Sequence, residues 1–295
     1  MGTKITDLAT ITDVASNDIL TGVDVSDTTG SANGTNKKFT KASLLSGVAL
    51  EAYQLSGWNP LGETLAYVSV DDPTGVVKVV GKDVTDKLSV GMRLMFTNGG
   101  NVIKAIVTAI AFSVDTTITF LHEIDPTDSQ ALTLMGNSAI TLPYFSTEKA
   151  PYGFPLDPDK WTVKVSSSAS QDATASSVSG TVYPVTNLNI TIPIGIWNVK
   201  YLLNARVYNL NAAADLKSSF STASNSATNT EYSSQMSISA ITSGQIIQSL
   251  NNYFTVKNTA KTPWYVVMWA SLTGCGFGIR GDLLTCFVKA TCAYL

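Results

Sequence analysis

Short apolar runs alternate with polar residues between positions 58 and 121, and glycine, proline, asparagine and aspartate separate the runs. A period of two places every second side chain on one face, which is typical of strands that cover a core. The segment Asp71-Asp72-Pro73-Thr74-Gly75 and the pair Asn98-Gly99 predict tight turns. Strands are expected at residues 66–70, 76–80, 92–96, 102–112 and 115–121. The pattern predicts a small barrel or sandwich of about five or six strands.

The alternation resumes in the last third of the chain. Leu188, Ile190, Ile192 and Ile194 fall on one face, and Gly195 predicts a turn into the next strand. Two stretches rich in Ser, Ala and Asn, 166–180 and 211–230, are expected to be loops. Further strands are expected at residues 161–165, 197–208, 232–241, 253–257, 264–270 and 283–295. Strands and turns at this spacing predict a jelly-roll-like β-sandwich.

Three prolines, Pro151, Pro155 and Pro158, surround Gly153 and precede Trp161. Each proline fixes its own φ and steers the preceding residue to extended geometry. We therefore expect a stiff, extended connector at residues 151–165. It separates a small β-barrel or sandwich domain at 57–150 from a jelly-roll-like tip domain at 166–295. The predicted fold class is all-β.

The first 56 residues follow neither pattern. Their apolar residues stand in short clusters separated by Thr, Ser, Asp, Asn and Gly, too sparse to close a core. We expect an extended segment that must borrow a surface from a partner. Residues 40–55 are the best helical candidate, because Thr40 can cap a helix and the apolar residues that follow have roughly helical spacing.

Composition agrees with strands that have neutral polar faces. Hydrophobic residues make up 44% of the 295 residues and charged residues only 14%, against about 25% charged in typical domains. The net charge of −3 gives no basic surface for phosphates, so nucleic acid is not an expected partner. The sequence shows no apolar leader and no run of about 18 apolar residues. We expect a protein made in the cytosol, without membrane insertion.

Catalytic chemistry has little support in the sequence. His122 is the only histidine, which excludes two-histidine metal motifs. His122, Glu123, Asp125 and Asp128 offer at most a weak cation site, and a solvated loop is the favoured interpretation. Carboxylate pairs of the kind that hydrolyse glycans occur only in expected turns or loops, where solvation explains them: Asp71 with Asp72, Asp157 with Asp159, and Asp215 with Glu231. We assign no catalytic, cofactor-binding or metal-binding residue and no cofactor, and we expect no enzymatic activity.

Three cysteines lie near the end of the sequence. Cys286 and Cys292 alternate onto one face of an expected strand, roughly 20 Å apart. That separation excludes a disulfide between them, so only Cys275 can pair with either one. Buried free thiols that pack as small apolar residues are the favoured interpretation.

Trp264, Tyr265 and Trp269 form a dense aromatic run. In a strand, Tyr265 and Trp269 share one face and Trp264 takes the other. The run, with Phe277, is either a platform for a sugar ring or core packing, and core packing is favoured. The nearby tripeptide Arg280-Gly281-Asp282 is interpreted as a turn.

The beginning of the chain resembles a known family. The pattern T-D-L, then S-N-D-I-L-x-G-V-D-V-S-D-T, then G-T-N-K-K-F-T-x-A-S-L-L resembles the N-terminal segment of tailed-bacteriophage fibre and spike proteins. In that family this segment docks the fibre onto the virion. The resemblance implies a set of virion-anchoring residues: Ile5, Leu8, Ile19, Leu20, Val23, Asp24, Phe39, Leu44 and Leu45.

Two further stretches resemble the same family. The set G-W-N-P-L-G-E-T, D-K-L-S-V-G-M-R-L and Y-F-S-T-E-K-A-P-Y-G-F-P, across residues 58–155, is similar to a module of phage tail and fibre proteins. The ending I-R-G-D-L…A-Y-L resembles the last strand of trimeric jelly-roll heads, which often runs close to the threefold axis. This implies a homotrimer, with Val288, Tyr294 and Leu295 at the trimer interface.

Together these features predict a non-enzymatic tail fibre of the phage virion. Its expected partners are two further copies of itself, other virion proteins of the tail or capsid through the N-terminus, and a host-surface glycan or protein through loops such as 211–230. Two alternatives stay open: a head fibre or capsid decoration protein with the same anchor, and a glycan-degrading spike.

Overall fold

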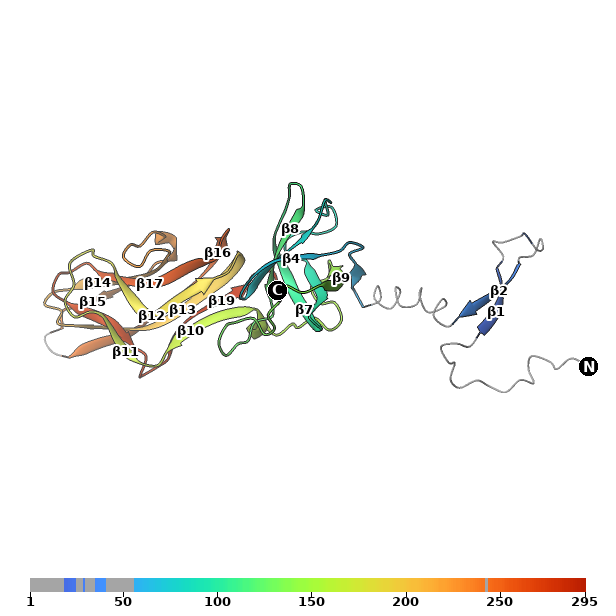
Figure 1. Ribbon diagram of the computed structural model, residues 1–295. Helices are drawn as coiled ribbons and strands as arrows, with labels where there is room; N and C mark the ends of the chain where they lie inside the picture. The colour runs from blue at the N-terminus through green and yellow to red at the C-terminus, as the bar shows by residue number, and fades with distance from the viewer. Residues whose placement is uncertain (1–18, 25–28, 30–34, 41–55, 242–243) are drawn as a thin grey trace, which may run out of the picture. The chain divides into compact units, whose positions relative to one another are not determined.

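The computed structural model describes residues 19–24, 29, 35–40, 56–241 and 244–295 (Figure 1). These residues form an all-β protein, which confirms the predicted fold class. The chain divides into two compact units, Met1–Asn59 and Pro60–Leu295. In the first unit, β1 (Ile19–Asp24) and β2 (Thr35–Thr40) pair antiparallel, with Leu20 opposite Phe39. The helix expected at 40–55 lies outside the described residues, apart from Thr40, which ends β2.

A seven-stranded sheet curls around the first core of the second unit. Its order is β3-β9-β6-β7-β8-β5-β4. The strands are β3 (Asn59–Pro60), β4 (Ala66–Asp71), β5 (Thr74–Val79), β6 (Arg93–Asn98), β7 (Asn101–Phe112), β8 (Thr116–His122) and β9 (Ile140–Ser146). We call this sheet the barrel. Val77, Ile103 and Val107 lie in its core, and Phe96 meets Phe120 edge to face with ring centroids 5.5 Å apart.

The turn between β6 and β7 differs by one residue from the expected one. Asn98 pairs with Asn101, so the two-residue loop is Gly99-Gly100. Both glycines have positive φ, 58° and 86°, as a tight hairpin turn with right-handed strands requires. Asn98 instead holds a neighbouring loop: its side-chain Nδ2 donates to the carbonyl oxygens of Gly136 at 3.2 Å and Ser138 at 3.0 Å.

Two sheets form a sandwich in the rest of the second unit. A six-stranded sheet has the order β10-β19-β13-β18-β11, with β16 also paired to β13, and a four-stranded sheet has the order β12-β17-β14-β15. The strands are β10 (Thr162–Ser167), β11 (Ser170–Thr174), β12 (Tyr183–Ile192), β13 (Gly195–Tyr208), β14 (Ala214–Ser221), β15 (Ser234–Ile238), β16 (Gln245–Asn258), β17 (Thr262–Ala270), β18 (Gly276–Arg280) and β19 (Cys286–Cys292).

The strand order is that of a jelly roll. The β10 strand pairs with β19 and β11 with β18, and β13 pairs with both β18 and β19 along one side. If β10/β11 and β18/β19 each count as one interrupted strand, eight strands remain in chain order. Their orders in the two sheets are then 1-8-3-6 and 2-7-4-5. This alternation between two four-row sheets is the double Greek key of jelly rolls, as predicted.

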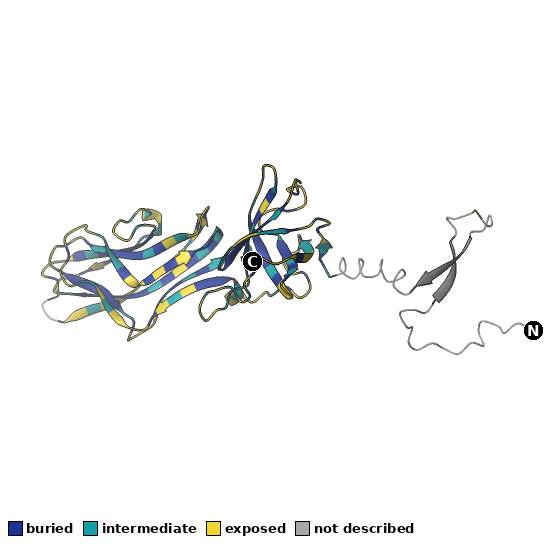
Figure 2. Ribbon diagram, viewed as in Figure 1, coloured by how far each residue is buried: buried dark blue, intermediate teal, exposed yellow. Residues whose placement is uncertain are grey.

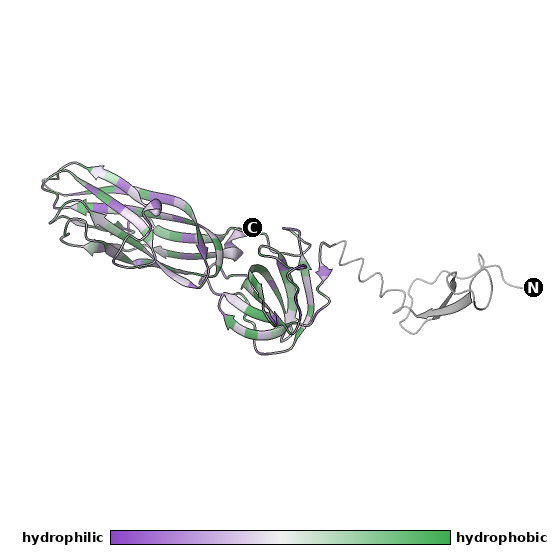
Figure 3. Ribbon diagram, turned by 90° about the horizontal axis from the view of Figure 1, so that it is seen from above, coloured by the Kyte–Doolittle hydropathy of each residue, from purple (hydrophilic) through white to green (hydrophobic). Residues whose placement is uncertain are grey.

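Alternation along the strands matches the expected faces (Figures 2 and 3). Leu188, Ile190 and Ile192 of β12 are buried, while the residues between them are exposed. Gly195 begins β13 with φ of 126°. The turn there is not a hairpin, because β12 and β13 belong to different sheets, so the chain crosses from one layer to the other.

The prediction of two loops from Ser-rich and Ala-rich composition is wrong in part. The 166–180 stretch contains β11, and the 211–230 stretch contains β14. Each of these strands bonds to a more apolar partner, β18 or β17. Small polar residues can occupy a strand when the neighbouring strand supplies the packing, because strand preference depends on context more than on the residue itself.

The expected connector at 151–165 is not extended throughout. Gly153 has positive φ and Phe154 closes a turn onto Pro151. A short 3-10 helix, η2 (Pro158–Trp161), follows, and β10 begins at Thr162. The indole of Trp161 is buried, stacks on Phe154 at 5.0 Å and donates to the Pro155 carbonyl.

Arg93 is a fully buried cation at the end of the barrel. Its guanidinium donates to the backbone carbonyl oxygens of Lys149 at 3.0 Å, Gly91 at 2.8 Å and Tyr294 at 3.0 Å, and it lies 4.8 Å from the centre of the Phe154 ring. Burial lowers the pKa of Arg93. The three carbonyl acceptors compensate in part for the lost hydration of the charge.

Candidate functional site

A polar cleft lies where the connection between β14 and β15 meets the ends of β16 and β17. Its volume is about 360 Å³. We call it the loop cleft, and it is lined by Thr222, Thr228, Asn229, Tyr232, Val256, Lys257, Asn258, Thr259, Thr262 and Trp264. Three of these residues fall in the stretch 211–230, where recognition loops were expected.

Side-chain hydroxyls fix the wall of the loop cleft. Ser221 Oγ donates to the Ser226 carbonyl at 2.5 Å and lies 2.8 Å from Thr228 Oγ1. It also accepts hydrogen bonds from two backbone N–H groups of the same connection. Ser219 Oγ donates to the Asn229 carbonyl at 2.8 Å. Ser and Thr side chains often replace backbone partners in tight turns, so this connection holds its shape without a regular ladder.

Aromatic rings support the floor of the loop cleft. Trp264 stacks on Phe220, with ring centroids 4.9 Å apart, and Tyr232 stacks on Phe254 at 4.2 Å. Trp264 is buried, so core packing is confirmed for this residue. Tyr265 and Trp269 lie on the opposite face of β17, half-buried. Burial and the nearby Glu231 raise the pKa of Tyr232, so its hydroxyl remains a donor at neutral pH.

The lining of the loop cleft can bind a neutral polar ligand. It offers hydroxyl, amide and ammonium groups beside the half-buried Tyr232 ring. None of the described residues that line it is a carboxylate or a histidine. A few convergent polar groups beside aromatic surface are typical of sites that recognise small polar molecules.

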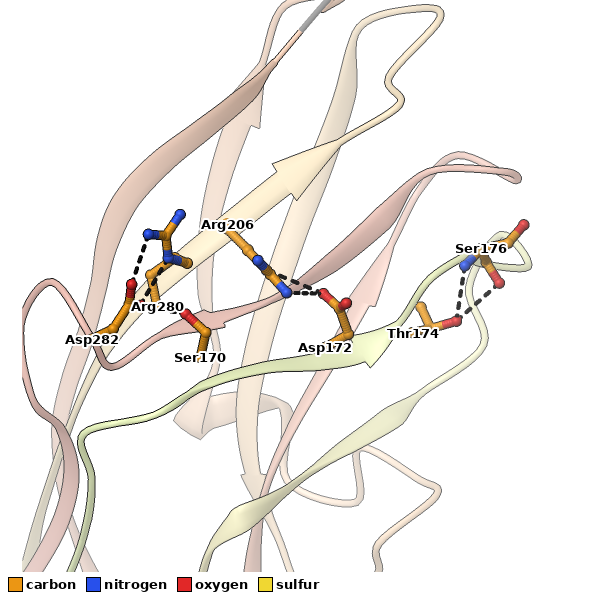
Figure 4. A network of polar contacts seen from close by, with 7 residues as sticks. All are labelled: Ser170, Asp172, Thr174, Ser176, Arg206, Arg280 and Asp282. Carbon is orange, nitrogen blue, oxygen red and sulfur yellow. Dashed lines mark hydrogen bonds and ion pairs between the residues drawn. The ribbon is translucent and has the colours of Figure 1, made fainter.

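A second polar network lies across three strands of the six-stranded sheet (Figure 4). Gly278 of β18 pairs with Asp172 of β11 on one side and Arg206 of β13 on the other. Arg206 Nη2 reaches across Gly278 to Asp172 Oδ1 at 2.6 Å, and its Nε donates to the same oxygen at 3.1 Å. Because glycine has no side chain, the guanidinium can cross the middle strand.

Arg280 and Asp282 are already paired with each other in the same view (Figure 4). Arg280 Nε and Nη2 donate to the two Asp282 oxygens at 2.8 and 2.7 Å, and Ser170 Oγ donates to Asp282 as well. These contacts hold the pKa of Asp282 well below its usual range, Arg280 being the larger cause. The tripeptide 280–282 lies at the turn after β18, as expected.

The carboxylates that the sequence offered as possible catalytic pairs mostly form ion pairs or accept hydrogen bonds from nearby groups. Asp71 pairs with Lys261 at 2.5 Å, and Asp72 accepts the backbone N–H of Ala131. Asp157 caps η2 by accepting from the Asp159 N–H at 3.0 Å. Asp159 pairs with Lys289 at 3.0 Å, Asp215 accepts from Ser237 Oγ at 2.5 Å, and Glu231 lies in η3 (Thr230–Tyr232).

His122 is a core residue of the barrel. It is 1% exposed, and its ring lies 4.9 Å from that of Phe120. Burial lowers the pKa of His122 to about 4, opposed in part by a backbone group of Thr133. Glu123 pairs with Lys160 at 2.8 Å, and Asp125 accepts from the Thr127 N–H. Within the described ranges, no group of three or more His, Cys, Asp or Glu side chains is arranged to hold a metal ion.

All three cysteines are free and buried, which confirms the favoured interpretation. Cys286 and Cys292 point into the sandwich from β19. Burial raises the pKa of Cys292 to about 11. In the described part of the chain, no helix is long and apolar enough to span a bilayer.

The residues expected to anchor the chain are only partly described. Ile19, Leu20, Val23 and Asp24 lie in β1, and Phe39 lies in β2. Ile5, Leu8, Leu44 and Leu45 lie outside the described residues.

The residues expected at a trimer interface lie in two kinds of environment. Val288 is fully buried inside one chain, where β19 lies between β10 and β13, so it has no exposed area to bury against another copy. Tyr294 and Leu295 are half-buried. Tyr294 lines an apolar cleft of about 430 Å³ with residues of β7 and β13, and Lys149 Nζ donates to the Leu295 carbonyl at 3.3 Å.

No protein-family profile and no curated protein matches this sequence. Among solved structures, dimeric latent PorU from Porphyromonas gingivalis is similar at 10% identity, over 78% of this chain and 24% of that one, with a TM-score of 0.26. A structure of infectious bursal disease virus, Gx strain, is similar at 9% identity over 79% and 78%, with a TM-score of 0.28. An isomalto-dextranase from Arthrobacter globiformis is similar at 9% identity over 85% and 44%, with a TM-score of 0.24. This chain spans about a quarter of PorU. Similarities at this level carry no argument about function.

Proposed function

We propose that this chain is a non-enzymatic fibre protein of a tailed-phage virion. Its N-terminal segment attaches to the particle, and its jelly roll presents the loop cleft to a glycan on the host surface. The observation that carries the proposal is the jelly-roll strand order of the C-terminal sandwich, because such sandwiches are used both as lectin domains and in viral particles.

The N-terminal unit supports attachment. Its β1–β2 pair is a two-stranded hairpin, and isolated hairpins of this kind are marginally stable in water. Apolar residues are sparse in the sequence of this segment, so a partner surface would add to its stability. The sequence resemblance to fibre and spike proteins makes that partner a virion protein.

Deletion and particle binding test the attachment step. The intact protein is expected to join particles that lack it, and a chain without residues 4–45 is expected to stay folded, soluble and oligomeric but fail to join. Aggregation of the shortened chain would contradict the proposal. In electron micrographs of labelled particles, the label is expected on the tail; label on the capsid would instead favour a head fibre or decoration protein.

Host binding tests the loop cleft. The double variant Asn229→Ala and Lys257→Ala removes an amide and an ammonium from the lining, and it is expected to lower binding to host cells by at least about tenfold. Ser224→Ala, in the same connection but outside the lining, is the matched control. Cells stripped of surface polysaccharide should lose binding of the intact protein, and unchanged binding would exclude a glycan ligand.

Threefold assembly is part of the same proposal. Charge is scarce in this sequence, so few Lys or Glu residues guard the sheet edges against pairing with other chains. A closed ring of copies covers such edges. Light scattering should give three chain masses, and one chain mass across a wide concentration range would contradict a trimer. A charged residue at Val288 would report on folding because that side chain is buried, so Tyr294→Asp is the better probe of assembly.

A further inference from the structure

Three lysines form a row across the outer face of the six-stranded sheet. Lys289 of β19 stands directly opposite Lys164 of β10 on one side and Lys200 of β13 on the other. Residues on both sides of Lys289 and Lys200 in their strands are buried, so the lysines point away from the core. Neighbouring strands lie about 4.8 Å apart, so the row spans about 10 Å.

Folding alone does not account for this row. Like charges directly opposite each other destabilise a sheet, and the sequence has only 19 Lys and Arg residues to place. Lys289 pairs with Asp159 at 3.0 Å. Among the described residues, no carboxylate forms an ion pair with Lys164 or Lys200, although the Lys200 ammonium lies 6.0 Å from the centre of the Phe287 ring. The row therefore carries unneutralised positive charge.

Neutral polar groups lie beside the row. Thr291 stands opposite Thr162 and Asn198, and Asn198 stands opposite Thr255. The Thr162 and Thr291 hydroxyls are 2.9 Å apart, and Thr255 Oγ1 donates to Asn198 Oδ1 at 3.0 Å. Thr162 is buried and donates to the Pro158 carbonyl at 2.8 Å, so Thr291, Asn198 and Thr255 form the accessible line of hydroxyl and amide groups parallel to the lysines.

Aromatic surface completes the face. Tyr253 of β16 stands opposite Lys200 and is 65% exposed. Phe287 comes two residues before Lys289 in β19, on the side of the row away from Thr291. It pairs with Leu202 and is half-buried. Ammonium groups, hydrogen-bonding groups and an exposed ring thus share one surface, and each matches a different part of one ligand.

We propose that this face is a second binding site, for an acidic polysaccharide. Sugar carboxylates meet the ammonium groups of Lys164 and Lys200, sugar hydroxyls meet the Thr and Asn line, and the Tyr253 ring packs on the apolar face of a sugar ring. The net charge of −3 opposes unselective attraction of polyanions, so binding depends on this local match. The site shares no residue with the lining of the loop cleft and does not require a role in the virion.

Binding of the intact protein to polygalacturonate, measured by calorimetry at low and at physiological salt, tests the proposal. The intact protein is expected to bind, more weakly at higher salt, and to ignore neutral dextran. The double variant K164Q/K200Q should bind at least about tenfold more weakly, and K164R/K200R should bind as the intact protein does. The control K217Q changes a lysine of β14, on the other sheet, and should have no effect.

Several outcomes would overturn the proposal. These are binding that K164Q/K200Q leaves unchanged, equal binding of dextran, or binding of poly-L-glutamate or oligo-dT at least as tight as that of polygalacturonate. Removal of the repulsion should keep or raise the thermal midpoint of K164Q/K200Q, so lost binding in that variant is not loss of fold. Host-cell binding by the Asn229 and Lys257 variant reports on the loop cleft separately, so either site can fail without the other.

Discussion

The interior of the barrel and the outer face of the sandwich use polar side chains in opposite ways. In the barrel, buried polar groups tie the backbone together: Arg93 bonds three carbonyls, Asn98 holds the loop at Gly136, and Thr116 Oγ1 donates to the Lys82 carbonyl at 2.6 Å. In the sandwich, polar side chains stand in rows on the outside of the six-stranded sheet, as in the line of Lys164, Lys289 and Lys200.

The difference separates structure from recognition. A buried polar group that loses its partner costs far more stability than an exposed one. The barrel should therefore tolerate few changes at its polar positions, whereas the outer face of the sandwich should tolerate many with little loss of stability. Substitutions in the two regions test this division directly.

Arg93→Met should have the largest effect. Methionine fills much of the volume but leaves the carbonyls of Lys149, Gly91 and Tyr294 without their donor. We expect the free energy of unfolding to fall by about 3–5 kcal/mol in urea titrations. Arg93→Lys keeps the charge but loses the planar fork, so it should lie between wild type and Arg93→Met. Stability equal to wild type in Arg93→Met would show that these carbonyls do not depend on Arg93.

His122 should make the barrel sensitive to acid. Its pKa is about 4 in the folded protein and 6.5 when exposed. Between these values the unfolded chain takes up a proton that the folded chain does not. The contribution of neutral His122 to the free energy of unfolding is therefore complete above pH 6.5 and is lost as the pH falls through 4. The total loss is about 3 kcal/mol. In urea titrations from pH 7 to pH 4, the free energy of unfolding should fall less steeply with pH for His122→Gln than for the wild type. The same pH dependence in both proteins would contradict this origin.

Gly278→Ala should be an exception to this division, because it is expected to cause a large loss of stability in the sandwich. A Cβ at Gly278 would lie 2.1 Å from the Gln171 carbonyl oxygen, a backbone atom that cannot turn away. The β11 and β18 strands must separate locally, and we expect a loss of about 1–3 kcal/mol. Gly136→Ala is the matched control, since nothing lies within 4 Å of its added Cβ. Equal thermal midpoints for the two variants would refute the close approach.

Arg206→Met should have the smallest effect. The Arg206–Asp172 pair lies on the outer face, with side-chain exposures of 19% and 39%. Partly exposed ion pairs contribute roughly 0–1 kcal/mol, so the loss in urea should stay below about 1 kcal/mol and shrink with added salt. A loss as large as that of Arg93→Met would erase the distinction between the two regions.

Strand faces were the most predictable part of the fold. The alternation of Leu188, Ile190 and Ile192 predicts a half-buried strand without further information. Many such segments together predict the all-β class and a jelly-roll-like sandwich. The β11 and β14 strands could not be found in this way, because Ser, Asp, Ala and Thr become strand residues only through the neighbours that pack on them. The β18 strand is hidden for a related reason: Gly276 and Gly278 suggest turns, yet the Tyr208 ring lies against Gly276 and the β11 backbone at Gln171 lies against Gly278, where a side chain would not fit.

The candidate sites depend on contacts that local sequence does not encode. The loop cleft brings Thr222 and Asn229 beside Lys257 and Trp264, and only the composition of the stretch 211–230 pointed toward it. The lysine row joins positions 164, 200 and 289, which meet through strand register alone. Val288 shows the opposite error: an apolar residue in a terminal strand suggests an interface, but the register turns it into the core.

The bond from Arg93 to the Tyr294 carbonyl links residues 201 positions apart, and this separation has a consequence for synthesis. At about 5–20 residues per second, a ribosome needs roughly 10–40 s to travel from one to the other. From the synthesis of Ser146, which ends β9, until that of Tyr294, every strand of the barrel has been made while the guanidinium still lacks one of its acceptors. The last bond of this cation therefore waits for residues that follow β19, and a nascent chain stalled before Tyr294 would carry an incompletely bonded cation in its barrel.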